Sequence, residues 1–270
     1  MAAYSSNPAF NRSPAFSNVA AVAKKLETPT PAQLDEQFGR PSATPADTGR
    51  MTYQDTAVKT VIAFAVLVAG AAIGWNVPGI WVVGALVGFV LAMVNIFKKK
   101  ISPALILAYA AFEGLFVGGI SQAYQGIADG IVPQAVFTTL AIVGITLALF
   151  ASGKVRASAR ATKIFLVAMV GVIAYSLVNV VLMFTGVSTG MFGLDSVTIG
   201  NTGIPLGVVV GILMVLLAAY SLVLDFDAIQ QGVRRGAPAV YAWQGAFGIM
   251  VTVVWLYLTI LRMIGLVRTN

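Results

Sequence analysis

The chain has 270 residues, of which 58% are hydrophobic and only 10% are charged, and its formal net charge is +7. Soluble domains contain about 25% charged residues, so this composition is typical of a membrane protein. The sequence contains no cysteine and no histidine. Disulfides, Cys-His and Ser-His nucleophilic systems and most zinc sites are therefore excluded. With no pair of nucleophile and base, we expect a protein that is not an enzyme and has no cofactor.

Residues 1–56 form a polar region rich in Ala, Ser, Pro and Asn, in which acidic and basic residues balance. The composition predicts a disordered cytoplasmic tail, with a short helix over Val19–Leu26 as a local alternative. A sharper alternative is a docking segment that uses Phe10 and Phe16. All the excess positive charge lies in residues 57–270, which is typical of membrane topology rather than of a nucleic-acid surface.

Residues 57–270 contain seven apolar stretches, each close to the ~20 residues that a helix needs to cross a bilayer. The expected spans are Val58–Trp75, Ile80–Phe97, Ala104–Ala123, Gln134–Phe150, Ile164–Phe184, Leu206–Leu224 and Ala242–Leu261. Prolines precede three of them, a position that favours a helix start. The sequence therefore predicts an all-α polytopic membrane protein, a bundle of seven transmembrane helices in a single domain.

Basic residues are confined to alternate loops between these spans. The loops after the second, fourth and sixth spans contain Lys98–Lys100, four basic residues within 154–163, and Arg234 with Arg235, whereas the other loops contain none. Because basic loops stay in the cytoplasm, the N-terminus is predicted to be cytoplasmic and the C-terminus outside. Arg262 and Arg268 run against this pattern, and we expect them to snorkel to the interface.

Small residues recur every four positions on three of the spans. They are Gly84, Gly88 and Ala92, then Ala110, Gly114 and Gly118, and finally Gly207 and Gly211. In lipid, such faces let helix backbones approach closely. They favour packing within the chain, and dimerisation is the alternative.

Glu113 lies near the middle of the third span. A carboxyl group at that depth is costly to ionise, and it usually faces the bundle interior or a water path. No Lys or Arg lies at membrane depth in another span, so Glu113 has no evident ionic partner. The alternative to a functional role is a protonated acid that hydrogen-bonds to Asn179 or Ser176.

Asp225 and Asp227 close the sixth span. Side chains two residues apart on a helix diverge by about 200°, so the two acids do not form one bidentate site unless the helix breaks. One would face the bundle while the other faces Arg234 or Arg235. Alternatively, both are interfacial acids that balance the charge of that loop.

The remaining polar residues carry weaker signals. Asp129 and Asp195 lie in loops on the outer side, where we expect them to be solvated. Asn95, Asn179 and Thr259 interrupt apolar spans and more often join helices than bind ligands. The sequence lacks a Schiff-base lysine in the last span, a phosphate-binding glycine loop and the spaced arginines of a voltage sensor.

Several segments together resemble the Bax inhibitor-1/YccA family of seven-span membrane proteins, the transmembrane BAX inhibitor motif group. The similarity covers about 57–268 and rests on four segments: Phe112-Glu-Gly-Leu115, Leu222-Val-Leu-Asp-Phe-Asp-Ala-Ile229, Trp255-Leu-Tyr-Leu258 continuing to Arg262, and the triple lysine followed by Ser102-Pro103. The resemblance implies a passive cation pathway, described for the family as a pH-sensitive calcium leak.

In some members of this family, an aspartate that ends span six shares a proton with an aspartate in span seven. Asp225 matches the first position. Alignment on Leu-Tyr-Leu places Thr259 at the second position, while counting back from Arg262 places Thr252 there. Neither is a carboxylate, so this chain departs from the family pattern. The resemblance and the cysteine-free composition favour the inner (plasma) membrane of a bacterium.

The leading hypothesis is a cation leak channel gated by protonation of Asp225, with Asp227 as an electrostatic partner and Glu113 lining the path. Calcium contacts at Asp225 and Glu113 would be weak and transient, because Ca²⁺ takes about 6–8 oxygen ligands. The partners would be the lipid bilayer and cations in transit, without nucleic acid. The alternative is a non-conducting regulatory partner of another membrane complex, such as a protease, and a weaker one is a proton-coupled transporter.

Overall fold

The computed structural model of the protein describes residues 30–32, 35, 39, 48–187, 192–200 and 203–269. It divides into two units, Met1–Thr44 and Pro45–Asn270. In the first unit, Pro31, Ala32, Asp35 and Gly39 are helical and exposed. The expected helix over Val19–Leu26 and the pair Phe10 and Phe16 lie outside the described residues, as does most of the tail whose disorder the sequence predicts.

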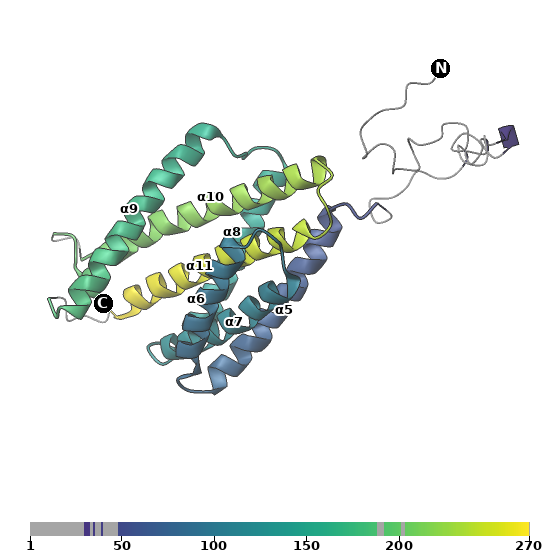
Figure 1. Ribbon diagram of the computed structural model, residues 1–270. Coiled ribbons are helices and arrows are strands. Elements are labelled where there is room, and N and C mark those ends of the chain that lie inside the picture. Colours follow the sequence, from purple (N-terminus) through teal and green to yellow (C-terminus); the bar gives the residue numbers. More distant parts are fainter. Residues whose placement is uncertain are drawn as a thin grey trace, which may run out of the picture. The chain divides into compact units, whose positions relative to one another are not determined.

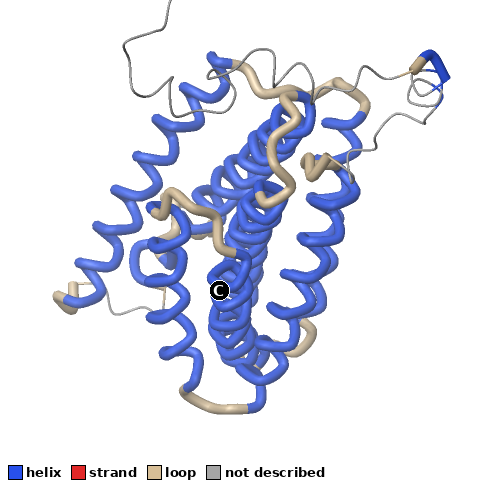
Figure 2. Tube along the Cα trace, turned by 45° about the vertical axis from the view of Figure 1, so that its right-hand side comes forward, coloured by secondary structure: helices blue, strands red, loops and turns tan. Residues whose placement is uncertain are grey.

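The described part of the second unit is a bundle of seven long helices (Figures 1 and 2). Their connections are short except between the fifth and sixth helices, where residues 185–205 intervene. The helices are α5 (Tyr53–Asn76), α6 (Ile80–Phe97), α7 (Pro103–Gln125), α8 (Ile131–Ala151), α9 (Ala159–Phe184), α10 (Leu206–Arg234) and α11 (Tyr241–Thr269), with one 3₁₀ turn, η1 (Gly193–Ser196). All seven are long and apolar enough to cross a membrane. The predicted all-α, seven-span architecture is confirmed.

Two helices extend well beyond the spans expected from the sequence. Helix α10 was predicted to end at Leu224 and ends at Arg234, and α11 continues from Leu261 to Thr269. The apolar stretch marks only the part of a helix that suits hydrocarbon, whereas the backbone continues until a residue such as Gly236, at φ +65°, ends it. Asp225 and Asp227 consequently lie inside α10 rather than at its end.

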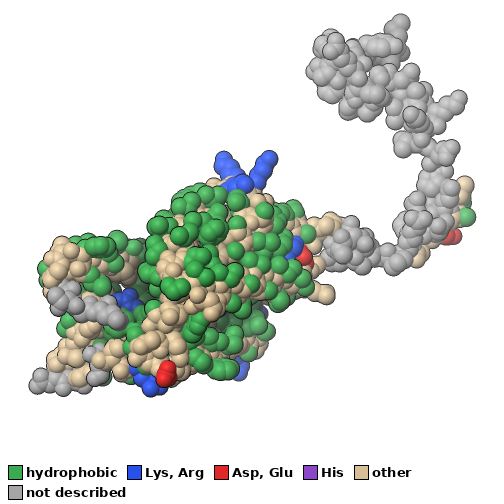
Figure 3. All heavy atoms as spheres, turned by 90° about the horizontal axis from the view of Figure 1, so that it is seen from below, with side chains coloured by type: hydrophobic (Ala, Val, Ile, Leu, Met, Phe, Trp, Pro, Cys, Tyr) green, Lys and Arg blue, Asp and Glu red, His purple; other side chains and the backbone are tan. Residues whose placement is uncertain are grey.

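Helix α11 is the centre of the bundle, because it packs on α10, α5, α8 and α7. Its buried residues include Met250, Val254, Leu256, Ile260 and Leu261, which form much of the main apolar core. Helices α6 and α9 have few buried residues and lie on the outside. Apolar side chains cover most of the face seen in Figure 3, and charged groups are sparse on it, as expected for a surface that faces lipid.

The small-residue faces are used for packing within the chain. A Cβ atom added at Gly118 of α7 would collide with the backbone carbonyl of Ala71 on α5, and one at Gly114 with the carbonyl of Leu67. On α6, a Cβ atom at Gly84 would lie 2.6 Å from the backbone nitrogen of Phe116. The backbones of α5, α6 and α7 therefore approach as closely as glycine allows, as the spacing predicts.

Gly118→Ala should destabilise the bundle by about 1–3 kcal/mol, because a methyl group cannot enter this contact unless α5 moves away. The measurement is the free energy of unfolding in mixed micelles, followed by tryptophan fluorescence. Gly144→Ala is the matched control, since Gly144 is also helical and a Cβ atom there meets nothing within 4 Å. Equal stabilities for the two variants would contradict the proposed close contact.

Candidate functional site

Asp225 points from α10 toward the central helix α11. Its carboxylate accepts a hydrogen bond from the Thr252 hydroxyl (Oγ1···Oδ2, 2.7 Å), and the Thr252 and Ser221 hydroxyls are 3.3 Å apart. Gly248, one turn before Thr252, leaves room for the acid, since a Cβ atom there would lie 3.1 Å from Oδ1. Helix α10 runs without a break through Asp225 to Arg234.

Asp225 lines a cavity of about 400 Å³ at the end of the bundle that contains the α10–α11 loop. The other lining residues come from α10, α11, their loop and the segment before α5, and they are Met51, Ala228, Ile229, Gly232, Ala237, Tyr241, Gln244, Gly245, Phe247 and Gly248. Tyr241 is the only other titratable side chain in this lining. Glycine and alanine make up about half of the wall, so the space is created by the absence of side chains.

Asp227 lies on a different side of α10. Its carboxylate accepts a hydrogen bond from Gln231 (Nε2···Oδ2, 2.6 Å), and the side-chain oxygen Oε1 of Gln231 accepts one from the Arg235 guanidinium at 3.0 Å. The lining of the Asp225 cavity does not include Asp227. The two acids diverge as the helical spacing predicts, with one facing the bundle and the other linked toward the basic loop.

Glu113 lies on α7 and faces α6 rather than α10. A Cβ atom added at Gly88 of α6 would lie 3.1 Å from the Glu113 carboxylate. The Tyr109 side chain, one turn earlier on α7, interacts with the same carboxyl group. Tyr109 also makes an edge-on contact with Phe247 of α11, with ring centroids 5.1 Å apart. Because Phe247 lines the Asp225 cavity, an aromatic pair lies between that cavity and Glu113.

Asn179 does not pair with Glu113, which was the alternative considered from the sequence. Its side-chain amide donates to the carbonyl oxygen of Phe192 at 3.2 Å, and its carbonyl oxygen accepts from the backbone N–H of Leu194 at 2.8 Å. Asn179 therefore fastens α9 to the loop before η1. Asn95 of α6 has a similar joining role, since it donates to the carbonyl oxygen of Leu105 on α7.

The prediction that Asp195 is solvated is wrong. Asp195 is only 4% exposed, forms an ion pair with Arg262 of α11 and accepts a hydrogen bond from the Tyr175 hydroxyl. Arg262 was expected to snorkel, but it binds this buried acid. In the predicted topology Arg262 lies on the outer side, where basic residues are not expected. Its presence there was the signal in the sequence for an acidic partner. Asp129 is exposed, as expected.

The described residues contain no group of three or more His, Cys, Asp or Glu side chains that can hold a metal ion. Besides the Asp225 carboxylate, the lining and its hydrogen-bond partners contain the Thr252 hydroxyl, the Gln244 side-chain carbonyl and the Tyr241 hydroxyl as oxygen groups. This set is smaller than the six to eight oxygens that Ca²⁺ takes. These side chains alone do not make up a calcium-binding cage.

The sequence model of the family described as Bax inhibitor 1 like matches residues 7–269, nearly the whole chain, so the chain belongs to this family. The match begins within the N-terminal tail, which the motif resemblance over 57–268 did not include. A search of curated proteins finds no match.

Proposed function

We propose that this member of the Bax inhibitor 1 like family is a pH-sensitive cation leak channel in which Asp225 binds both the proton and the passing cation. The observation that carries the proposal is the position of Asp225, a carboxylate in an apolar bundle that lines a cavity and has a neutral hydrogen-bond donor. A carboxylate in such a place attracts cations when it is ionised and loses that attraction when it is protonated.

Thr252 is the residue that stands opposite Asp225. The resemblance implies a second aspartate at this place in some relatives, where two acids share one proton. In this chain the second group is a hydroxyl, which donates a hydrogen bond but neither holds nor releases a proton near neutral pH. The gate would accordingly respond to a single proton on Asp225.

The path that we propose runs from the Asp225 cavity past Phe247 and Tyr109 to Glu113. The Tyr109 and Phe247 rings are in edge-on contact, and on this proposal they would close the path until they separate. Glu113 would then receive the ion at mid-membrane. Asp227 would add negative charge near the cavity without touching it. Calcium is the proposed ion, and the bacterial inner membrane is the proposed location.

The non-conducting alternative has less support from the packing. It assigned partner docking to the small-residue faces of the second, third and sixth spans. Those faces already contact other helices of the same chain, since added Cβ atoms at Gly84, Gly114 and Gly207 would all collide with neighbouring groups. A partner protein would need a different surface.

Asp225→Asn should abolish the pH dependence of the leak, because asparagine is a neutral isostere of the protonated acid. In liposomes that contain the full chain, Ca²⁺ entry into the variant should be the same at every pH and should equal that of the wild type at its acidic limit. Asp227→Asn is the matched control and should keep the wild-type profile. Identical profiles for wild type and Asp225→Asn would falsify the role of Asp225.

Thr252→Asp should move the midpoint of the pH response to higher pH by about one unit or more, because two carboxyl groups at hydrogen-bond distance cannot both ionise easily and so retain a proton. Thr252→Asn, of similar size but without charge, should leave the midpoint nearly unchanged. The same flux assay measures both variants. An unchanged midpoint in Thr252→Asp, with the protein folded, would show that position 252 does not share the proton of Asp225.

A further inference from the structure

The segment that precedes α5 pairs with the loop between α10 and α11. The backbone N–H of Met51 donates to the carbonyl oxygen of Ala237 at 2.7 Å, and that of Ala239 donates to Gly49 at 2.8 Å. Arg50 and Pro238 stand opposite each other in this antiparallel bridge. Pro238 suits this place, since the ladder takes no hydrogen bond from its nitrogen. We call residues 49–51 the strap.

Met51 inserts its side chain into the wall of the Asp225 cavity. The residue is only 4% exposed, and it packs with Ile229 and Ala242 in a small apolar cluster. Its sulfur atom sits against Gly232, where an added Cβ atom would lie 3.0 Å away. Much of the rest of the cavity lining is glycine and alanine. The thioether is thus one of the few long side chains that fill this end of the cavity.

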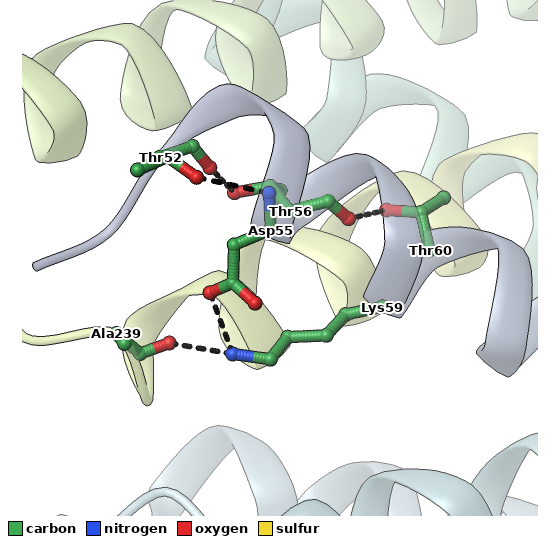
Figure 4. A network of polar contacts seen from close by, with 6 residues as sticks. All are labelled: Thr52, Asp55, Thr56, Lys59, Thr60 and Ala239. Atoms are coloured by element: carbon green, nitrogen blue, oxygen red, sulfur yellow. Dashed lines mark hydrogen bonds and ion pairs between the residues drawn. The ribbon is translucent and has the colours of Figure 1, made fainter. Parts of the chain in front are cut away.

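Lys59 links the start of α5 to the loop between α10 and α11. Its ammonium group binds the Asp55 carboxylate at 2.7 Å and the carbonyl oxygen of Ala239 at 2.9 Å (Figure 4). Thr52 caps the helix, since its hydroxyl accepts from the backbone N–H of Asp55 at 3.0 Å. These contacts keep α5 in place whether or not the strap itself is paired.

The strap pairs with the loop through two backbone hydrogen bonds, and it is also held by the Met51 side chain and by Arg50, which lies beside Gly236. Met is unbranched and adapts to irregular spaces, which suits a side chain that leaves and re-enters a cavity. Segments with few buried contacts open locally at low free-energy cost.

We propose that the strap is a lid on the Asp225 cavity, closed when Met51 is seated and open when the pairing of Gly49–Met51 with Ala237–Ala239 is broken. The idea that the lid controls conduction rests on the proposed function. Access to the cavity, in contrast, can be measured without measuring ion flux.

A disulfide can lock the lid. Arg50 and Pro238 are a non-hydrogen-bonded pair, which lies between the two backbone hydrogen bonds. The Cα atoms of such a pair are about 4.5 Å apart. This distance is within the range of about 4.4–6.8 Å that a disulfide needs. Because the chain contains no cysteine, the variant Arg50→Cys/Pro238→Cys would form only this bond. Oxidation should reduce Ca²⁺ entry into liposomes severalfold, and a reductant should restore it. The wild type, which has no thiol, is the control for both reagents.

Access to the cavity is measured in the Ile229→Cys variant, whose single thiol lies behind Met51. A charged, membrane-impermeant thiol reagent should label it severalfold faster when Met51→Ala is added, whereas Met51→Leu, of similar size, should label at the original rate. Arg234→Cys is the control, since Arg234 is exposed on the same helix and lies outside the cavity lining. Its labelling rate should be the same with Met, Ala or Leu at position 51.

The outcomes separate the lid from the channel. If labelling follows the size of residue 51 but no variant conducts, the lid stands and the proposed function fails. If the oxidised and reduced forms of the locked variant conduct equally, while Asp225→Asn still removes the pH response, the channel stands and the lid is overturned. Equal labelling of Ile229→Cys with Met51, Ala or Leu also overturns it. The oxidised and reduced states belong to one folded sample, so a folding defect cannot mimic the result.

Discussion

The hydrogen bond between Thr252 and Asp225 is the interaction on which the arrangement of this end of the bundle depends. A carboxyl group that is buried without a partner is strongly destabilising, so α10 and α11 must meet where Thr252 can donate to it. Gly248 allows this approach, since a Cβ atom there would already lie only 3.1 Å from the acid. The small residues beside Asp225 thus leave space for one carboxyl group between two long helices.

Asp195 is more deeply buried than Asp225, and the contrast between the two acids is why only Asp225 is proposed as a switch. Asp195 is bound to Arg262 and Tyr175, so a cation of the protein already occupies its carboxylate and holds the loop before α10. Asp225 is bound to a neutral hydroxyl, so no fixed cation competes with a passing ion or with a proton. Helix α11 supplies both partners, one at each site. The same helix therefore contributes the cation of one acid's ion pair and the neutral hydrogen-bond donor of the other acid.

The sequence was sufficient to predict the seven helices, their close-packed faces and the different directions of Asp225 and Asp227. These features follow from hydropathy and helical spacing alone. The sequence could not choose between Thr252 and Thr259 as the residue opposite Asp225. Seven residues are close to two full turns, so both lie on the same face of α11 and differ only in depth. Depth depends on how two helices cross, which is set by contacts such as Gly248 against Asp225. The burial of Asp195 also needed three segments far apart in the sequence to meet.

The cavity is likewise built from distant segments, and this has a consequence for how it can be controlled. Met51 comes from before the first helix, Asp225 from the sixth and Phe247 from the seventh. Helix α5 is already fixed by Lys59 and by glycine contacts with α7, so opening of the proposed lid would leave α5 in place. The family match starts at residue 7 and therefore includes the segment that supplies Met51 to the cavity wall.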